Sequence, residues 1–257
     1  MHGMIKRLSN SPSGVAIPSV VKNLCTSLPV SMLRTEDILI TVSPDDKPIG
    51  SVSKERAHRR KELYVEAQTK ERPLLHRAFS VFHFDDNSSL LLTQRSDKKV
   101  TFPMQWTNAC CSHPLWNIPE ENGGPIGGDA ETILAVKRAA QRRLQEELNM
   151  SINVEDLTFI SRILYYANAN KDYAEHEIDY ILISKLSVPF KAHPNEVNAT
   201  KWVSKDELRA MLNDQSVVFT PWSRYIMKSF LFDLWNGLDT LESFQNFKTI
   251  YNAGDLS

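Results

Sequence analysis

The chain contains 257 residues, of which 42% are hydrophobic and 24% are charged, and its formal net charge is −1. This composition predicts a soluble globular protein, and the near-zero charge excludes an overall basic surface that would attract nucleic acid or an anionic membrane. No apolar run approaches the ~20 residues that a membrane-spanning helix needs. An odd cysteine count, comprising Cys25, Cys110 and Cys111, is a poor disulfide framework and indicates a reducing compartment. We therefore expect a cytoplasmic protein, and we expect it to be a monomer.

The first 35 residues differ in composition from the rest of the chain. They contain basic residues, many serines and three prolines but no acidic residue, which is typical of a transit segment or a flexible leader. If the leader is a transit segment, the protein is expected in the mitochondrion or another organelle. We expect residues 36–257 to form a single domain.

Two β-hairpins are predicted in the first part of this domain. Their strands alternate or are continuously apolar, and polar turns at residues 43–48 and 85–89 separate them. Residues 101–115 and 117–128 contain prolines, glycines or both and predict irregular loops. The expected strands are residues 37–42, 49–53, 78–84 and 90–94.

A long helix is predicted over residues 129–148. Its apolar residues recur at three- and four-residue steps, with Asp129 as the N-cap and Asn149 as the C-terminal stop. Strands interrupted by few helices indicate an α+β (mixed α/β) fold. The remaining expected elements are strands at residues 158–166, 176–184 and 199–203, a short helix opened by the capping box at residues 204–207, and a helix over residues 221–238.

The loop at residues 101–115 carries the most reactive side chains. Cys110 and Cys111 are adjacent, and His113 follows one residue later. This spacing is compatible with a nucleophile, a metal site or an acid/base pair, and the local pattern does not choose between them.

Two carboxylates, Glu175 and Glu177, lie where the strand predicted at residues 176–184 begins. In a strand, the period of two places Glu175 and Glu177 on one face and His176 on the other. A solvated acidic strand end is one interpretation of this pair. A divalent cation is the other, because three imidazoles and two carboxylates would make a five-ligand site for magnesium, manganese, iron or zinc. The histidines available for such a site are His58, His76 and His113.

Basic residues next to the cysteine loop suggest an anionic ligand. Arg95 and Lys99 precede the loop, and their side chains are suited to phosphate or diphosphate. Further charges, Arg142, Arg143 and Glu147, lie on the predicted long helix, where intrahelical ion pairs are the simpler explanation.

The end of this helix, residues 142–150, resembles the tail of a Nudix box. Arg143 and Asn149 stand where that motif has a glutamate and a glycine, and Leu134 stands where it has its upstream glutamate. Nudix hydrolases hold catalytic magnesium on these glutamates, so the differences weaken a diphosphate-hydrolase function. A Nudix-like scaffold is nevertheless expected.

Several motifs together closely resemble type I isopentenyl-diphosphate isomerases. The resemblance covers residues 37–251, and its motifs agree in order and spacing. It implies a Nudix-like mixed β-sheet sandwiched by helices, with an N-terminal β extension. It also implies interconversion of isopentenyl diphosphate and dimethylallyl diphosphate through a tertiary carbocation, which feeds isoprenoid synthesis. The motifs are residues 75–80, 94–97, 107–115, 128–148, 175–180 and 220–222.

The same resemblance implies a role for individual residues. Cys111 and Glu177 match the catalytic cysteine and glutamate, and Tyr165 matches the tyrosine beside the acidic catalyst. The matching metal ligands are His58, His76, His113, Glu175 and Glu177, and Glu147 matches the contact to a second magnesium that accompanies the diphosphate. Substrate-binding positions match Lys54, Arg95, Lys99, Ser112 and, over the hydrocarbon tail, Trp222. The implied cofactors are diphosphate-associated Mg²⁺ and one Mg²⁺, Mn²⁺ or Zn²⁺ at the His₃Glu₂ site. A Nudix-type hydrolase and a non-catalytic binding module are the alternatives.

Overall fold

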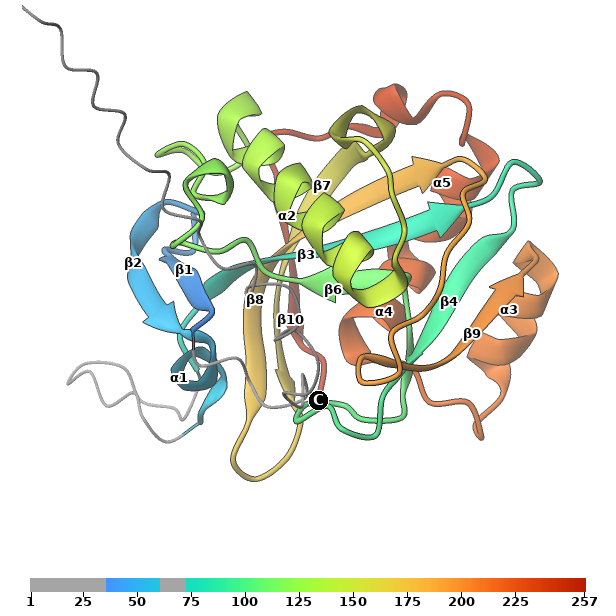
Figure 1. The fold of residues 1–257 in the computed structure, drawn as a ribbon, viewed down its shortest axis with the longest axis horizontal. Coiled ribbons are helices and arrows are strands. Elements are labelled where there is room, and N and C mark those ends of the chain that lie inside the picture. Colours follow the sequence, from blue (N-terminus) through green and yellow to red (C-terminus); the bar gives the residue numbers. More distant parts are fainter. Residues whose placement is uncertain (1–35, 61–72) are drawn as a thin grey trace, which may run out of the picture.

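A computed structural model describes residues 36–60 and 73–257. The leader predicted at residues 1–35 lies outside the described residues, and the single domain over residues 36–257 stays a prediction. Within the described part, ten strands join one hydrogen-bonded sheet (Figure 1). The strands are β1 (Ile38–Val42), β2 (Pro48–Ser53), β3 (His76–Phe84), β4 (Leu90–Arg95), β5 (Trp106–Thr107), β6 (Cys110–Ser112), β7 (Thr158–Asn168), β8 (Ala174–Lys185), β9 (Val197–Val203) and β10 (Ile250–Asp255).

The helices cover both faces of this sheet. The long helix α2 crosses one face, over β3 and β6, and the helices that follow β9 lie on the other side (Figure 1). The described α-helices are α1 (Lys54–His58), α2 (Ala130–Leu148), α3 (Lys205–Asn213), α4 (Pro221–Ile226) and α5 (Phe232–Asn236), with short 3₁₀ turns at Pro119–Glu121, Val154–Asp156 and Leu241–Phe244. None of the helices in this part of the chain has the length and apolarity of a membrane span.

The strands run in mixed directions. The main path is β10-β7-β8-β3-β1-β2, in which β3 is parallel to β8, and β7 is antiparallel to β8. The predicted N-terminal hairpin is confirmed: β1 pairs with β2, and β1 meets β3 at Thr41 and His76. This hairpin therefore extends one edge of the sheet. The short helix α1, which was not predicted, follows directly.

The second predicted hairpin is confirmed only beside its turn. β3 and β4 pair at His83 with Leu91 and at Phe84 with Leu90. The strands then separate, because β3 pairs with β6 while β4 pairs with β5 and β9. The prediction of an irregular loop at residues 101–115 was accordingly wrong for Trp106–Thr107 and Cys110–Ser112, which are sheet strands.

Successive side chains of β6 and the neighbouring strands point to opposite faces of the sheet, where they join two separate hydrophobic cores. Cys110 faces the core under α2, and Cys111 faces the core under α4 and α5. On β8, Tyr180 joins the first core and Ile181 the second. Burial of both faces explains why β8 is continuously apolar from Tyr180 to Ile183. The two adjacent thiols therefore lie on opposite sides of the sheet.

The helix predictions are largely confirmed. Asp129 caps α2 by accepting a hydrogen bond from Thr132 N at 2.7 Å, and Asn149 ends the helix in the left-handed conformation. The capping box of Ser204 and Glu207 opens α3. The helix predicted over residues 221–238 contains a π-helical segment, Met227–Leu231, between α4 and α5. Strand β10, parallel to β7, was not predicted.

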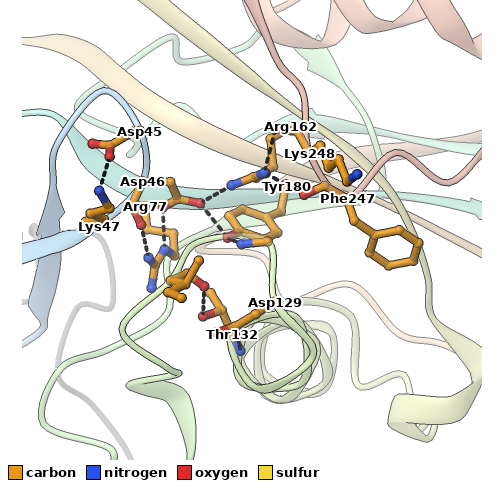
Figure 2. A network of polar contacts seen from close by, with 12 residues as sticks. Asp45, Asp46, Lys47, Arg77, Asp129, Thr132, Arg162, Tyr180, Phe247 and Lys248 are labelled. Atoms are coloured by element: carbon orange, nitrogen blue, oxygen red, sulfur yellow. Dashed lines mark hydrogen bonds and ion pairs between the residues drawn. The ribbon is translucent and has the colours of Figure 1, made fainter.

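A buried ionic network connects the β1–β2 turn to three central strands (Figure 2). Asp46 is fully buried, and its carboxylate lies 2.9 Å from Arg77 Nε, 2.9 Å from Arg162 Nη1 and 2.5 Å from the Tyr180 hydroxyl. Arg162 also donates to the carbonyl of Phe247 at 2.9 Å. The network therefore joins the N-terminal hairpin and the segment before β10 to the sheet that carries the site.

Candidate active site

Five predicted metal ligands meet at one end of the central strands. Each contributes a ligand atom, and all five atoms lie within 4.8 Å of one another. His76 on β3 lies opposite Glu177 on parallel β8, so strand register brings together two residues that are far apart in sequence. The prediction that Glu175 and Glu177 share a face, with His176 on the other, is confirmed, since His176 points to the carbonyl of Pro73. The cluster is His58, His76, His113, Glu175 and Glu177, and every member is buried.

Backbone carbonyls orient two of the imidazoles. His58 Nδ1 lies 2.6 Å from the carbonyl of Lys54, and His76 Nδ1 lies 2.8 Å from that of Leu74. Both Nε2 atoms therefore face the cluster: that of His58 is 2.8 Å from Glu175, and that of His76 is 3.4 Å from Glu177. An outward carbonyl and an inward nitrogen are typical of metal-binding histidines. The residues present thus fit a divalent cation.

Glu177 connects the cluster to Tyr165. One carboxylate oxygen lies 2.8 Å from His113 Nε2, and the other accepts a hydrogen bond from the Tyr165 hydroxyl. Burial opposes ionisation of Glu177, but contacts with His76 and Tyr165 outweigh it and lower the pKa of this carboxyl. Burial and the nearby carboxylate raise the pKa of Tyr165 well above its ordinary value. The tyrosine thus holds a proton against an ionised glutamate.

Cys111 lies on β6, opposite Ser80 of β3. Burial raises the pKa of the Cys111 thiol to about 11, and Arg95 only partly offsets that effect. Cys110 is 1% exposed, and burial raises the pKa of its thiol well above the ordinary value. Cys111 reaches the pocket described next, whereas Cys110 packs under α2.

A pocket of about 760 Å³, its open mouth included, joins these groups. It brings together nearly all the predicted site residues, while His76 and Glu147 lie outside its lining. The predicted residues that line it are Lys54, His58, Arg95, Lys99, Cys111, Ser112, His113, Tyr165, Glu175, Glu177 and Trp222.

Arg95 contacts the loop at residues 101–104 as well as Cys111. Its Nε and Nη2 donate to the carbonyls of Thr101 and Phe102 at 2.9–3.2 Å, and its Nη1 lies 3.6 Å from the Cys111 sulfur. Phe102 and Met104 both have positive φ, which is uncommon for residues other than glycine. Arg95 therefore helps to hold a strained loop against the pocket.

Further cations surround the pocket. Burial, together with the positive charges of Arg143 and Lys99, lowers the pKa of Lys54 to about 8. Lys99 forms an ion pair with Glu196, and Arg143 Nη2 lies 3.6 Å from the same carboxylate. Close packing of like charges raises their electrostatic energy, and a bound anion would lower it.

Trp222 forms an aromatic wall of the pocket. Its ring stacks on Tyr165 with centroids 6.0 Å apart, meets Phe102 edge-on at 5.3 Å, and lies 5.6 Å from the Arg95 guanidinium. The side chain is buried, and its Nε1 has no hydrogen-bond partner among the described residues. The π-face is thus held rigidly beside the groups that carry protons.

Glu147 is placed differently from the metal cluster. Arg143 Nε donates to its carboxylate at 3.1 Å, and Arg143 Nη2 contacts the same oxygen. The predicted role of Glu147 in contacting a second magnesium stays a prediction. Intrahelical pairing was the simpler explanation for these charges, and the pair is present.

Three charged residues of the pocket were not selected from the sequence as site residues. Asp37, Arg143 and Glu196 all line the pocket. The sequence offered one feature that could have identified Arg143 as a site residue, because it stands where the Nudix-box tail has a glutamate. Asp37 and Glu196 had none, because each is an ordinary acidic residue beside a strand.

Comparisons with known proteins agree with this geometry. A NUDIX domain family model matches residues 74–223. An isopentenyl-diphosphate delta-isomerase of Gibberella zeae is 44% identical over 208 residues, which cover 80% of this chain and 78% of the relative. The Candida albicans isopentenyl-diphosphate delta-isomerase is 38% identical over 259 residues, covering 94% and 88%.

The fold is also found among solved structures. A NUDIX hydrolase from Alicyclobacillus acidocaldarius aligns with a TM-score of 0.50 at 12% sequence identity, covering 70% of this chain and 99% of that one. This similarity concerns the fold alone and confirms the predicted Nudix-like α+β architecture. The identity to the curated relatives is far higher, and their matches extend over most of both chains. The chain therefore belongs to the isopentenyl-diphosphate delta-isomerase family, built on a NUDIX domain.

Proposed function

We propose that this protein interconverts isopentenyl diphosphate and dimethylallyl diphosphate. The observation that carries the proposal is the convergence of Cys111, Tyr165 and Glu177 on one pocket that is also lined by cations. A diphosphate would be attracted by Lys54 and Arg143, and its binding energy would hold a short hydrocarbon tail in a reactive position. The location of the protein in the cytoplasm, its monomeric state and the absence of a nucleic-acid partner remain proposals.

The reaction needs two proton transfers at neighbouring carbons. One group adds a proton to the terminal carbon of the alkene, which leaves positive charge on the tertiary carbon. A second group removes a proton from the next carbon, and the electrons of that C–H bond form the new double bond. Cys111 Sγ and the Glu177–Tyr165 pair are the groups that exchange these protons, and the opposite direction of reaction exchanges their roles.

The pocket environment favours this chemistry. Tyr165 and Glu177 are buried and Cys111 is half-buried, so water has little access to compete for the carbocation or for the protons. Trp222 offers a π-face to the positive charge, and a cation over an indole gains ~2 kcal/mol or more when it is desolvated. The charge therefore develops beside a wall that attracts it.

The His/Glu cluster holds a divalent metal in this proposal, with Mg²⁺, Mn²⁺ and Zn²⁺ as candidates. Such a cation would neutralise the two carboxylates and fix the position of Glu177. A further Mg²⁺ would accompany the diphosphate, and Glu147 is the residue that would contact it. Lys99, Ser112 and Arg95 complete the proposed surroundings of the substrate.

Hydrolysis of the diphosphate is not favoured. Arg143 stands at a position where the Nudix box has a glutamate, and it pairs with Glu147. The curated relatives described above are isomerases by name. No observation supports a purely binding function, because a pocket that only holds diphosphate needs neither Cys111 nor Tyr165.

The test is to incubate the purified full chain with Mg²⁺ and isopentenyl diphosphate. An acid-labile allylic diphosphate is the expected product, whereas released phosphate would indicate a hydrolase, and neither would indicate a binder. Cys111→Ala is expected to abolish turnover. Cys110→Ala is the matched control and is expected to retain most of it, because Cys110 lies on the opposite face of the sheet. The reverse pattern would refute the assignment of Cys111.

A further inference from the structure

We propose that Glu121 and Arg142 are positioning residues, which together hold the His113 imidazole in its place in the metal cluster. Neither residue lines the pocket, and the pair acts through the backbone on either side of Pro114. The inference rests on the proposed function to the extent that it takes the His/Glu cluster to bind a divalent metal.

Glu121 lies in the 3₁₀ turn Pro119–Glu121, and its side chain is only 3% exposed. Arg142 of α2 donates two hydrogen bonds to this carboxylate, from Nε to Oε1 at 2.6 Å and from Nη2 to Oε2 at 2.9 Å. Parallel N–H···O bonds of this kind fix the two planar groups in one relative orientation. The turn is thereby attached to a rigid, nineteen-residue helix.

The Glu121–Arg142 ion pair, called the clamp below, also contacts the backbone that carries His113. Glu121 Oε2 accepts a hydrogen bond from Leu115 N at 3.0 Å, and Arg142 Nη2 lies 3.4 Å from the carbonyl of His113. The backbone is therefore held immediately after the imidazole and again two residues later. On the other side of His113, strand β6 is held by its pairing with β3.

Support for the His113 side chain itself is limited. Its Nε2 faces Glu177 at 2.8 Å, and its Nδ1 is buried without a hydrogen-bond partner among the described residues. His58 and His76, by contrast, are each oriented through Nδ1 by a backbone carbonyl. His113 therefore depends on its backbone for its orientation, and the Glu121–Arg142 pair provides much of that restraint.

A third contact makes the effect of losing the clamp selective. Leu115 forms an isolated β-bridge with Leu39 of β1, so the loop remains attached to the hairpin when the clamp is broken. The expected result is a loosened ligand rather than a detached loop. Groups around a metal that orient its ligands change metal affinity by about 10–100-fold when they are substituted.

The decisive variant is Glu121→Gln in the full chain. Its amide oxygen can still accept from Leu115 N, but the charged fork to Arg142 is lost. Arg142→Lys is the second variant, since it keeps the positive charge and removes the fork. Arg138→Lys is the matched control. Arg138 lies one helical turn earlier and is exposed, and within the described residues its one hydrogen bond is to the Glu120 carbonyl, at 3.5 Å.

The measurement is the affinity of metal-free protein for Co²⁺ alone, followed by visible absorption, with His113→Ala defining the background. We expect Glu121→Gln to bind Co²⁺ about 10–100-fold more weakly than the wild type. Arg142→Lys should also bind Co²⁺ more weakly, and Arg138→Lys should keep the wild-type affinity. The melting temperature of each metal-free variant shows whether it folds; if Glu121→Gln does not, Arg142→Lys decides by the same criterion.

The possible failures are distinguishable. The positioning role would be overturned if Glu121→Gln bound Co²⁺ as tightly as the wild type, with both affinities above the background. This holds even if the variant melts at a lower temperature. Wild-type binding no stronger than that of His113→Ala would instead refute the metal site on which the inference rests.

Discussion

Asp46→Asn is expected to destabilise the protein strongly, whereas Asp45→Asn at the adjacent position is not. Asp46 is fully buried and has a φ of 63°. Asparagine matches its size and also tolerates this left-handed conformation, so the substitution removes the charge with little added backbone strain. The comparison therefore isolates the electrostatic contribution of one carboxylate.

The magnitude follows from the contacts that Asp46 makes. Its two oxygens lie 2.9 Å from Arg77 Nε and 2.9 Å from Arg162 Nη1, and both arginines are buried (Figure 2). Removing the anion leaves two buried guanidinium groups without their counter-charge, and breaking a buried pair in this way costs roughly 3–5 kcal/mol. At about 2–4 °C per kcal/mol for a chain of this size, the melting temperature should fall by roughly 6–20 °C.

The control differs from Asp46 in exposure rather than in chemistry. Asp45 pairs with Lys47 at 2.7 Å, but both side chains are more than half exposed. Water and salt screen such a pair, so little change in melting temperature is expected. Thermal unfolding followed by far-ultraviolet circular dichroism measures both variants. Equal shifts for Asp45→Asn and Asp46→Asn would refute the role assigned to the buried network.

Two further predictions concern the pocket. Burial opposes ionisation of Glu196, but Lys99 and Arg143 outweigh it and lower its pKa to about 2. Ionised Glu196 therefore stabilises the fold at pH values above the ordinary carboxyl pKa of ~4.3, and this stabilisation is lost as the pH falls toward about 2. Glu196→Gln should reduce the dependence of the melting temperature on pH over that interval. An unchanged dependence would contradict the pairing of Glu196 with Lys99 and Arg143. Trp222→Leu should lower kcat roughly 30-fold, the equivalent of the ~2 kcal/mol of a desolvated cation–π contact. The exposed Trp116→Leu should not change kcat, and a Trp222→Leu variant with unchanged kcat and raised KM would show that the indole only binds the substrate.

Local patterns were sufficient wherever a residue's conformation depends on its near neighbours. Asp129 and Asn149 were identified as the ends of α2 because caps satisfy backbone groups within one turn. The common face of Glu175 and Glu177 follows from strand geometry alone. Local patterns also made His58, His76 and His113 available as ligands, and the family resemblance added their assignment to one metal site.

Pairing partners could not be read in the same way. The turn at residues 85–89 predicted that β3 and β4 form a hairpin, yet most of β3 pairs with β6 and β8. A turn determines only the register close to it, while the rest of each strand pairs with whichever strand buries its side chains best. The parallel strand β10 was missed for a related reason, because its pairing with β7 is entirely long-range.

The sequence by itself determined the family, the main helix, most strands and the residue types of the site. Only the tertiary structure decided that Cys110 and Cys111 face different cores, that Arg95 holds the loop beside Cys111, and that Glu121 contacts the backbone two residues after His113. The physical reason is that these relations depend on which strand or helix lies opposite. Which strand or helix lies opposite depends on how both faces of the sheet are buried. The local sequence around these residues does not indicate it.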